Sequence, residues 1–331
     1  MRRVFHCHDK RVIPGRSIDD FDSPLFIAWQ VSNRCAGCCL ACCEESGPDK
    51  AWPDELSRDE ALSVARKLAG ANIPYVAFGG GEPLMSPHIW DIFSILSDAG
   101  SSLKIETDGG QIDDDALDRL AELRVDNVQI SVDGATPAAH AAMRPGAPSF
   151  DQATGALRRL AERGIPAEMV FVPTRQTIAD AVPLYDLATE IGCDAFVTGP
   201  LMRLGRAAAT WDSLAPDKAG WEHCVIALRE RQQSRGDGSA RLSIYPWDIE
   251  AEIQHRLQNP QAMMLIVPNG RVKLLNALPF SPADLRVHSM AEAWAAYRRA
   301  WRAPAVADFI ARCRTEPELL RHANECWPME T

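Results

Sequence analysis

The chain has 331 residues, a net charge of −10 and a hydrophobic content of 46%. A chain of this length can bury a full core, and a single barrel-like α/β domain of this size is ordinary. The negative charge argues against a general nucleic-acid-binding surface, which needs a clustered basic face. No stretch approaches the roughly 18 consecutive apolar residues of a membrane-spanning helix, so we expect no membrane partner.

Short apolar runs alternate with helical patterns through the first two thirds of the chain, which predicts βα units and a parallel sheet. The predicted strands are residues 25–31, 74–79, 102–107, 127–132, 166–172 and 194–199. The predicted helices between them are residues 57–69, 88–98, 113–123, 150–163 and 178–190. We therefore expect an α/β fold with a right-handed βα series that is shorter than a closed eight-stranded barrel.

The pattern changes after about residue 200. Helical patterns fall at residues 217–234, 290–300, 303–313 and 316–324, an extended segment at 241–246, and a hairpin at 262–276. Asn269-Gly270 forms the predicted hairpin turn, because this dipeptide between apolar runs is a strong hairpin signal. We divide the chain into an N-terminal extension (1–24), a core (25–205) and a C-terminal α+β extension (206–331).

Five of the ten cysteines lie within residues 35–43, directly after the first predicted strand. Cys35, Cys39 and Cys42 form a C-x3-C-x2-C pattern. Iron–sulfur clusters are usually held by four Cys thiolates, so three thiolates would ligate three irons of a [4Fe-4S] cluster and leave the fourth iron open. Cys38 offers a second spacing, C-x2-C-x3-C, which the residues alone leave open.

Two other uses of these cysteines are less favoured. A structural zinc site usually takes four ligands as two separated pairs, and no such pairing is present downstream. Residues Met1–His6 lack the sustained apolar region of a secretory signal, so we expect a cytoplasmic protein. Cytoplasmic thiols are normally kept reduced, which argues against a disulfide framework.

A glycine run, Gly79-Gly80-Gly81, followed by Glu82, ends the second predicted strand. Glycine lets the backbone approach a ligand closely, and a carboxylate accepts hydrogen bonds from an ammonium group. This combination predicts a small-molecule site at the end of that strand.

Over residues 25–205 these motifs resemble the radical S-adenosylmethionine (SAM) superfamily. The resemblance implies that Cys35, Cys39 and Cys42 hold one [4Fe-4S] cluster, whose open iron is ligated by the methionine part of SAM. It also implies that Gly80, Gly81 and Glu82 bind the SAM amino group. The implied fold is a partial (β/α)6 TIM-like barrel with the C-terminal α+β extension covering it.

Three further motifs carry the resemblance. Thr107 and Asp108 precede a glycine, as in the family's T-N-G turn, with Asp in place of Asn. Ser131 and Asp133 stand in an S-V-D-G stretch similar to the family's S-x-D-G, and Arg144 matches the arginine that follows it. The resemblance places these residues near the SAM ribose or carboxylate.

The C-terminal part is similar to the branch that includes molybdenum-cofactor and PQQ-maturation enzymes. Gly205-Arg206-Ala207 and the hairpin at Leu265–Lys273 match that branch, whose extension (SPASM, or its half-length twitch relative) carries auxiliary clusters. Here Leu274–Ala277 stands where the branch has cysteine. We therefore expect a degenerate extension and one cluster only, with isolated thiols at Cys193, Cys224, Cys313 and Cys326.

The resemblance implies a reaction. An external one-electron donor such as flavodoxin or ferredoxin would reduce the cluster, SAM would be cleaved to a 5'-deoxyadenosyl radical, and the radical would abstract hydrogen from a substrate. Lys104 and Glu106 alternate on one predicted strand and therefore share a face, which makes them candidates for substrate contact or a solvated or helix-packed pair. Arg175, Arg203 and Tyr245–Asp248 are weaker candidates.

Two substrate classes and one non-enzymatic function compete. Because neither auxiliary-cluster cysteines nor an N-terminal recognition domain is evident, we expect a small metabolite in natural-product or cofactor biosynthesis. The alternative is a peptide presented by a partner protein. A non-catalytic iron–sulfur or zinc protein is a further alternative, disfavoured by Glu82, because a metal scaffold alone has no need of a ligand for the SAM amino group.

Overall fold

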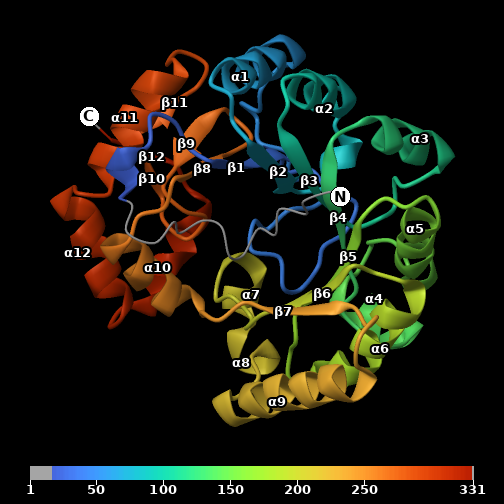
Figure 1. Cartoon of the computed structure of the whole chain (residues 1–331). Helices are drawn as coiled ribbons and strands as arrows, with labels where there is room; N and C mark the ends of the chain where they lie inside the picture. The colour runs from blue at the N-terminus through green and yellow to red at the C-terminus, as the bar shows by residue number, and fades with distance from the viewer. Residues whose placement is uncertain (1–16, 330–331) are drawn as a thin grey trace. The chain divides into compact units, whose positions relative to one another are not determined.

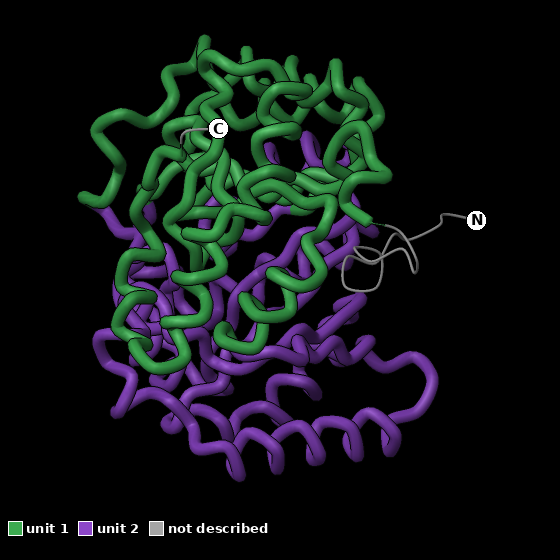
Figure 2. Tube along the Cα trace, turned by 90° about the vertical axis from the view of Figure 1, so that its left-hand side faces the viewer, with its two compact units in different colours: residues 1–34, 49–104, 249–331 green, residues 35–48, 105–248 purple. Residues whose placement is uncertain are grey.

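The structure is a computed structural model that describes residues 17–329. It consists of two units (Figure 2). Unit 1 contains the described part of residues 1–34 with residues 49–104 and 249–329, and unit 2 contains residues 35–48 and 105–248. The expected N-terminal extension lies outside the described residues up to residue 16, and its remainder includes the 3-10 helix η1 (Ile18–Asp20).

The strands of unit 1 are ordered β11-β9-β8-β1-β2-β3. Their bounds are β11 (Ala283–Asp284), β9 (Arg271–Lys273), β8 (Met263–Ile266), β1 (Phe26–Ser32), β2 (Tyr75–Gly80) and β3 (Ser102–Thr107), whose residues up to Lys104 belong to this unit. β1 pairs in parallel with both β2 and β8. Ile27 and Trp29 of β1 are almost completely buried, because an internal parallel strand is covered on its faces.

The predicted hairpin is confirmed. β8 and β9 pair antiparallel, and Gly270 in the turn has a φ of 78°, a conformation that glycine adopts readily. The register places Leu265 opposite Lys273. Since β8 also pairs with β1, the hairpin from the C-terminal part of the sequence extends the sheet that the N-terminal strands begin.

Two neighbouring helices of unit 1 lie within one residue of their predicted bounds. α1 (Arg58–Gly70) begins with a capping box between Ser57 and Glu60, in which each residue's side chain accepts from the other's backbone N–H. It packs beside α2 (Ile89–Asp98) (Figure 1). The remaining elements of the unit are η2 (Pro83–Met85), α10 (Ile249–Gln258), α11 (Met290–Ala300), α12 (Pro304–Cys313), η4 (Pro317–Asn324), β10 (Phe280–Ser281) and β12 (Trp327–Pro328).

Unit 2 continues from the end of β3 through four parallel strands. Their bounds are β4 (Val125–Ser131), β5 (Ala167–Phe171), β6 (Ala195–Thr198) and β7 (Arg241–Ile244), and each pairs with the next. The predicted extended segment at 241–246 therefore adds a parallel strand to the series. Ile130, Met169 and Phe196 of this sheet are fully buried.

Helices cover the strands of unit 2 (Figure 1). α5 (Phe150–Glu162) packs on β4 and β5, α6 (Ala181–Ile191) packs on β5 and β6, and α9 (Lys218–Arg235) packs on β7 and α6. α3 (Asp114–Glu122) precedes β4, and the 3-10 helix η3 (Ile178–Asp180) precedes α6.

Sequence reasoning missed four short α-helices, and one helix that it predicted is a 3-10 helix rather than an α-helix. The missed helices are α4 (Pro137–Met143), α7 (Gly205–Ala209), α8 (Trp211–Leu214) and α10. α4 has too few residues to show a helical period, although Thr136 caps it and Pro137 opens it. The predicted helix at 316–324 is the 3-10 helix η4.

The domain boundaries predicted at residues 24 and 205 stay predictions.

Within residues 17–329 no helix combines the length and hydropathy that crossing a lipid bilayer requires.

Candidate metal and cofactor site

Residues 35–48 of unit 2, the cysteine loop, are held by backbone hydrogen bonds rather than by regular secondary structure. The N–H of Cys35 donates to the carbonyl of Gly47 over 3.0 Å, which closes the ends of the loop. The N–H of Cys38 donates to Pro145 over 2.7 Å and that of Leu40 to Met143 over 2.9 Å. The loop is therefore fastened to the segment that ends α4.

The five thiols of the loop differ in exposure. Cys35, Cys39 and Cys42 are half-buried, as is Cys43, whereas Cys38 is exposed. The Cys42 sulfur accepts the N–H of Ser46 over 3.4 Å.

Three of these thiols have raised pKa values, and burial, followed by the charge of Glu44, raises the pKa of Cys43. Burial raises the pKa of Cys39, and the positive charge of Arg144 acts against that rise. Burial, followed by the charge of Glu44, raises the pKa of Cys42.

The donor chemistry of the loop fits an iron–sulfur cluster. Thiolates are the ligands of such clusters, and three of the thiols lie on one short segment that also offers backbone donors to sulfur. Across residues 17–329 no three His, Cys, Asp or Glu side chains are already gathered closely enough to hold a metal ion. The thiols thus share a loop without converging on one point.

Asp133 and Arg144, both predicted site residues, form a buried ion pair. Arg144 Nη1 donates to Asp133 Oδ2 over 2.8 Å, and the two side chains are 12% and 6% exposed. Burial acts to lower the pKa of Arg144, but the charge and hydrogen bond of Asp133, together with Cys39 and Asp108, outweigh it, and the pKa is raised. Asp133 Oδ1 also accepts the N–H of Val172, so one carboxylate joins the ends of two neighbouring strands to α4.

His140 supports this pair and was not recognised from the sequence. The N–H of Asp133 donates to His140 Nδ1 over 3.3 Å, and His140 Nε2 lies 3.1 Å from the carbonyl oxygen of Pro148. This arrangement requires the neutral tautomer with its proton on Nε2. Burial, followed by the charge of Arg144, lowers the pKa of His140 and favours that neutral form.

The other predicted residues of unit 2 lie where their strands end. Thr107 is the last residue of β3, and its hydroxyl accepts the N–H of Gly109 over 3.1 Å. Asp108 is buried, and its carboxylate accepts the N–H of Gly110 over 2.9 Å. Ser131 is the half-buried last residue of β4. These side chains shape the turns at the carboxyl ends of the strands, the position where α/β folds bind ligands.

The glycine motif belongs to unit 1. Gly80 is the last residue of β2, and Gly81 crosses the end of β1 so closely that an added Cβ would lie 2.1 Å from the carbonyl oxygen of Arg34. Only glycine fits there. Glu82 is 1% exposed; its N–H donates to Arg34 over 2.9 Å, and its carboxylate caps η2 by accepting the N–H of Leu84 over 3.0 Å.

Lys104 and Glu106 occupy alternate positions on β3, as predicted. They differ in burial, since Lys104 is buried and Glu106 is exposed.

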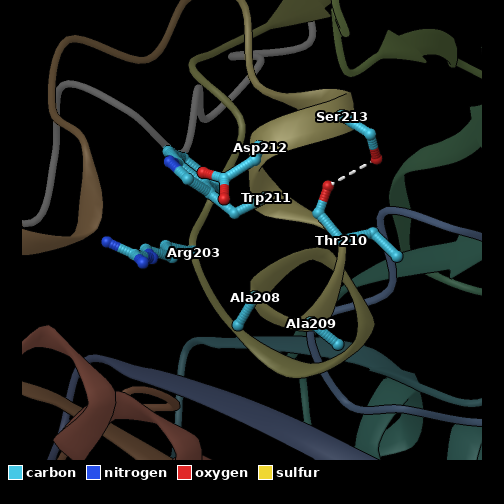
Figure 3. A pocket seen from close by; sticks show the side chains of 7 residues that line it. All are labelled: Arg203, Ala208, Ala209, Thr210, Trp211, Asp212 and Ser213. Atoms are coloured by element: carbon cyan, nitrogen blue, oxygen red, sulfur yellow. Dashed lines mark hydrogen bonds between the residues drawn. The ribbon is translucent and has the colours of Figure 1, made fainter.

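A pocket of about 300 Å³ lies on unit 2, beside α7 and α8 (Figure 3). Its polar lining comes from Arg203, Thr210, Asp212 and Ser213, and the guanidinium carbon of Arg203 lies 5.6 Å from the centre of the Trp211 ring. Arg203 was one of the weaker sequence candidates, and it lines this pocket.

Residues 29–188 match the family model of the Radical SAM superfamily. This range contains the cysteine loop, the glycine motif and the Asp133–Arg144 pair. Residues 29–188 are therefore a radical SAM domain.

Curated proteins similar to this chain include maturases and synthases. The mycofactocin maturase MftC of Mycobacterium ulcerans is 33% identical over 199 residues, which cover 60% of this chain and 53% of the relative. The AdoMet-dependent heme synthase of Methanosarcina barkeri is 25% identical, and the match covers 64% of this chain and 60% of the relative. The sporulation killing factor maturation protein SkfB of Bacillus subtilis is 26% identical, and the match covers 71% of this chain and 55% of the relative. The chain thus spans about half the length of the MftC relatives that it matches.

Solved structures of radical SAM proteins share its fold. SuiB of Streptococcus suis bound to S-adenosylmethionine superposes with a TM-score of 0.67 at 15% identity, covering 82% of this chain and 66% of SuiB. The protein anSMEcpe with bound AdoMet and a Cp18Cys peptide gives a TM-score of 0.61 at 15% identity, covering 81% of this chain and 79% of that one. At this identity the likeness concerns the fold alone, and it confirms the predicted α/β class of a partial barrel with a C-terminal extension.

Proposed function

We propose that the chain is a radical SAM enzyme that holds one [4Fe-4S] cluster through Cys35, Cys39 and Cys42. The observation that carries the proposal is the cysteine loop itself, which places half-buried thiols in a backbone-bonded loop inside the matched family range. The donor set suits iron–sulfur ligation and leaves one iron open.

The exposure of the thiols supports this choice of three cysteines. Cys38 is exposed, whereas Cys39 is half-buried where the charges of Arg144 and Asp133 act on it. The half-buried thiol of Cys39 suits a cluster ligand better than the exposed thiol of Cys38, because burial and nearby charge tune the cluster potential.

The SAM contacts are assigned by motif. We assign Gly80, Gly81 and Glu82 to the amino group of SAM, because a close-packed backbone and a buried carboxylate suit an ammonium ligand. For the ribose and carboxylate we assign Thr107, Asp108, Ser131, Asp133 and Arg144. Arg144 already pairs with Asp133 through Nη1, and a guanidinium has further N–H donors with which to bind a carboxylate.

When bound, the cluster and SAM supply one-electron cleavage chemistry that ends in hydrogen-atom abstraction from the substrate. The residues of the chain position and shelter that chemistry. Asp133 fixes the Arg144 guanidinium at the ends of β4 and β5, so its charge needs no reorganisation when an anionic group arrives. We assign electron delivery to an external donor of the flavodoxin or ferredoxin class.

Of the two substrate classes, we propose a peptide. The support comes from the names of relatives: MftC and SkfB are maturation proteins, and SuiB has been solved bound to its precursor peptide SuiA. A small metabolite, the first expectation from the sequence, is the second candidate, since the relatives also include a heme synthase. Lys104, Glu106 and Arg203 stay candidates for substrate contact.

One anaerobic experiment tests the enzyme class. The protein is reconstituted with iron and sulfide, mixed with SAM and dithionite, and assayed for 5'-deoxyadenosine and methionine. We expect both products in the wild type and neither in the Cys42→Ala variant. A full cluster with bound SAM but no cleavage, in the presence of candidate peptides and metabolites, would contradict the proposed activity.

A further inference from the structure

Arg206 reaches from α7 into the cysteine loop and is bonded to three of its carbonyl groups. Its Nε donates to the carbonyl of Cys39 over 2.9 Å, and its Nη2 donates to that of Ser46 over 2.5 Å. Its backbone N–H donates to the carbonyl of Cys42 over 3.1 Å. Arg206 therefore bonds the backbone of the loop before Cys42, at Cys42 and after it.

The residue before Arg206 makes this approach possible. Gly205 has a φ of 51°, and an added Cβ would lie 2.4 Å from the carbonyl oxygen of Cys43 and 2.5 Å from that of Cys42. Any other residue would push α7 away from the loop. The Gly205-Arg206 pair is thus built for contact with the backbone of the cysteine loop.

The loop needs such a partner because its carbonyls have no regular secondary structure to bond them. Partly buried backbone carbonyls are almost always hydrogen-bonded in folded proteins. A guanidinium carries five N–H donors in a rigid fork, so it can bond Cys39 and Ser46 at once and hold the distance between them. A lysine ammonium keeps the charge but lacks the fork.

We propose that Arg206 is a positioning residue that organises the cysteine loop for cluster assembly and retention. The inference rests on the proposed function, in which Cys39 and Cys42 are cluster ligands. By bonding the carbonyl groups of both ligands and of Ser46, Arg206 holds their backbones in the arrangement from which the thiols converge on the irons. Its positive charge, held beside the loop, also favours the reduced cluster, which carries one more negative charge.

The test uses two variants of the full chain and a matched control. Arg206→Gln removes the fork and the charge, and Arg206→Lys removes the fork alone. Arg231→Gln is the control: Arg231, on α9, donates two hydrogen bonds of 2.8 Å to Asp186, on α6. Melting temperatures show whether each variant folds, and if Arg206→Gln does not, Arg206→Lys decides the test.

Three measurements follow anaerobic reconstitution. The first is the chelator concentration that removes half of the bound iron, which we expect to fall roughly tenfold or more in Arg206→Gln and to fall less in Arg206→Lys. The second is amide hydrogen exchange in residues 35–48 before iron is added, which should be faster in both variants. The third is the cluster midpoint potential, which should fall in Arg206→Gln and stay near the wild-type value in Arg206→Lys. Arg231→Gln should match the wild type in all three.

The outcomes separate this inference from the proposed function. A wild-type protein that takes up no [4Fe-4S] cluster overturns the proposed function and this role with it. A wild type with a full cluster, together with an Arg206→Gln variant that has wild-type iron retention, loop exchange and potential, overturns the role of Arg206 alone.

Discussion

Arg144 and Asp133 lie 2.8 Å apart at the ends of α4 and β4, and they neutralise each other in a place that water hardly reaches. One oxygen of the Asp133 carboxylate accepts a hydrogen bond from Arg144, and the other accepts one from the N–H of Val172. The pair therefore connects the ends of two strands, and its arginine places a positive charge that acts on Cys39.

Removing the acid of this pair should destabilise the protein strongly. Asp133→Ala leaves the guanidinium of Arg144 buried without its counter-charge and the N–H of Val172 without its acceptor. Breaking a buried pair by removing one partner typically costs about 3–5 kcal/mol. Urea unfolding of the variant should show a loss in that range. An exposed pair offers a control: Arg58→Ala, which breaks the bond to Asp91, should cost less than about 1 kcal/mol. Equal losses in the two variants would contradict the structural role of Asp133.

Glu82 offers a test of SAM binding that leaves the fold intact. Its carboxylate caps η2 by accepting the N–H of Leu84, and a glutamine can make the same bond through its amide oxygen. Glu82→Gln should therefore melt near the wild-type temperature while losing the charge that we propose binds the ammonium group of SAM. Charge-assisted hydrogen bonds contribute about 1.5–3 kcal/mol, so the Kd for SAM should rise roughly tenfold to a hundredfold. Anaerobic equilibrium dialysis with labelled SAM measures this, and an unchanged Kd would remove Glu82 from the proposed site.

The three cysteines that we propose as cluster ligands should be separable from the two other cysteines of the loop. Alanine at Cys35, Cys39 or Cys42 should abolish cluster assembly, because each is expected to ligate one iron. Alanine at Cys38 or Cys43 should leave iron and sulfide content at the wild-type level. Full iron in Cys39→Ala combined with loss in Cys38→Ala would show that the alternative spacing is the one used.

Much of the βα series could be predicted because its elements are long enough to show a period. α5 begins at the predicted residue and ends one residue before its predicted end, and α1 differs from its prediction by one residue at each end. Short elements carry no such signal, which is why α4, α7 and α8 were missed. Capping by Thr136 and Pro137 was a usable signal for α4 that sequence reasoning passed over.

The candidate site also has residues that the sequence reveals and contacts that it does not. Motif residues such as Glu82 and Arg144 could be named from the sequence, since their spacing is local. The hydrogen bonds from Arg206 to Cys39 and Ser46 join residues 167 and 160 positions apart. The bond from the N–H of Val172 to Asp133 and the bond from the N–H of Asp133 to His140 also depend on tertiary packing. Such contacts follow from how strands and loops end against each other, which no periodicity encodes.

His140 should make the stability of the protein depend on pH. Its pKa is lowered by burial and by the charge of Arg144, and Asp133 and the carbonyl of Pro148 oppose that shift only in part. In the unfolded chain a histidine titrates with a pKa of about 6.5, so at falling pH the unfolded state takes up the proton first. The free energy of unfolding should therefore decrease as the pH falls below that value, and the decrease should end once the pH is below the lowered folded-state pKa.

The variant His140→Asn isolates this effect. His88 also has a lowered pKa, caused first by burial, and it titrates in both proteins, so its contribution cancels in the difference between them. Urea unfolding at several values between pH 8 and pH 5 should show a smaller loss of stability in the variant than in the wild type. Protonated His140 cannot accept the N–H of Asp133, so the loss in the wild type reflects the breaking of that bond as well as the burial of a charge. Parallel pH curves for the two proteins would mean that His140 takes up its proton equally readily in the folded and unfolded states. That result would contradict the role of the imidazole as the neutral acceptor that holds Asp133 in place.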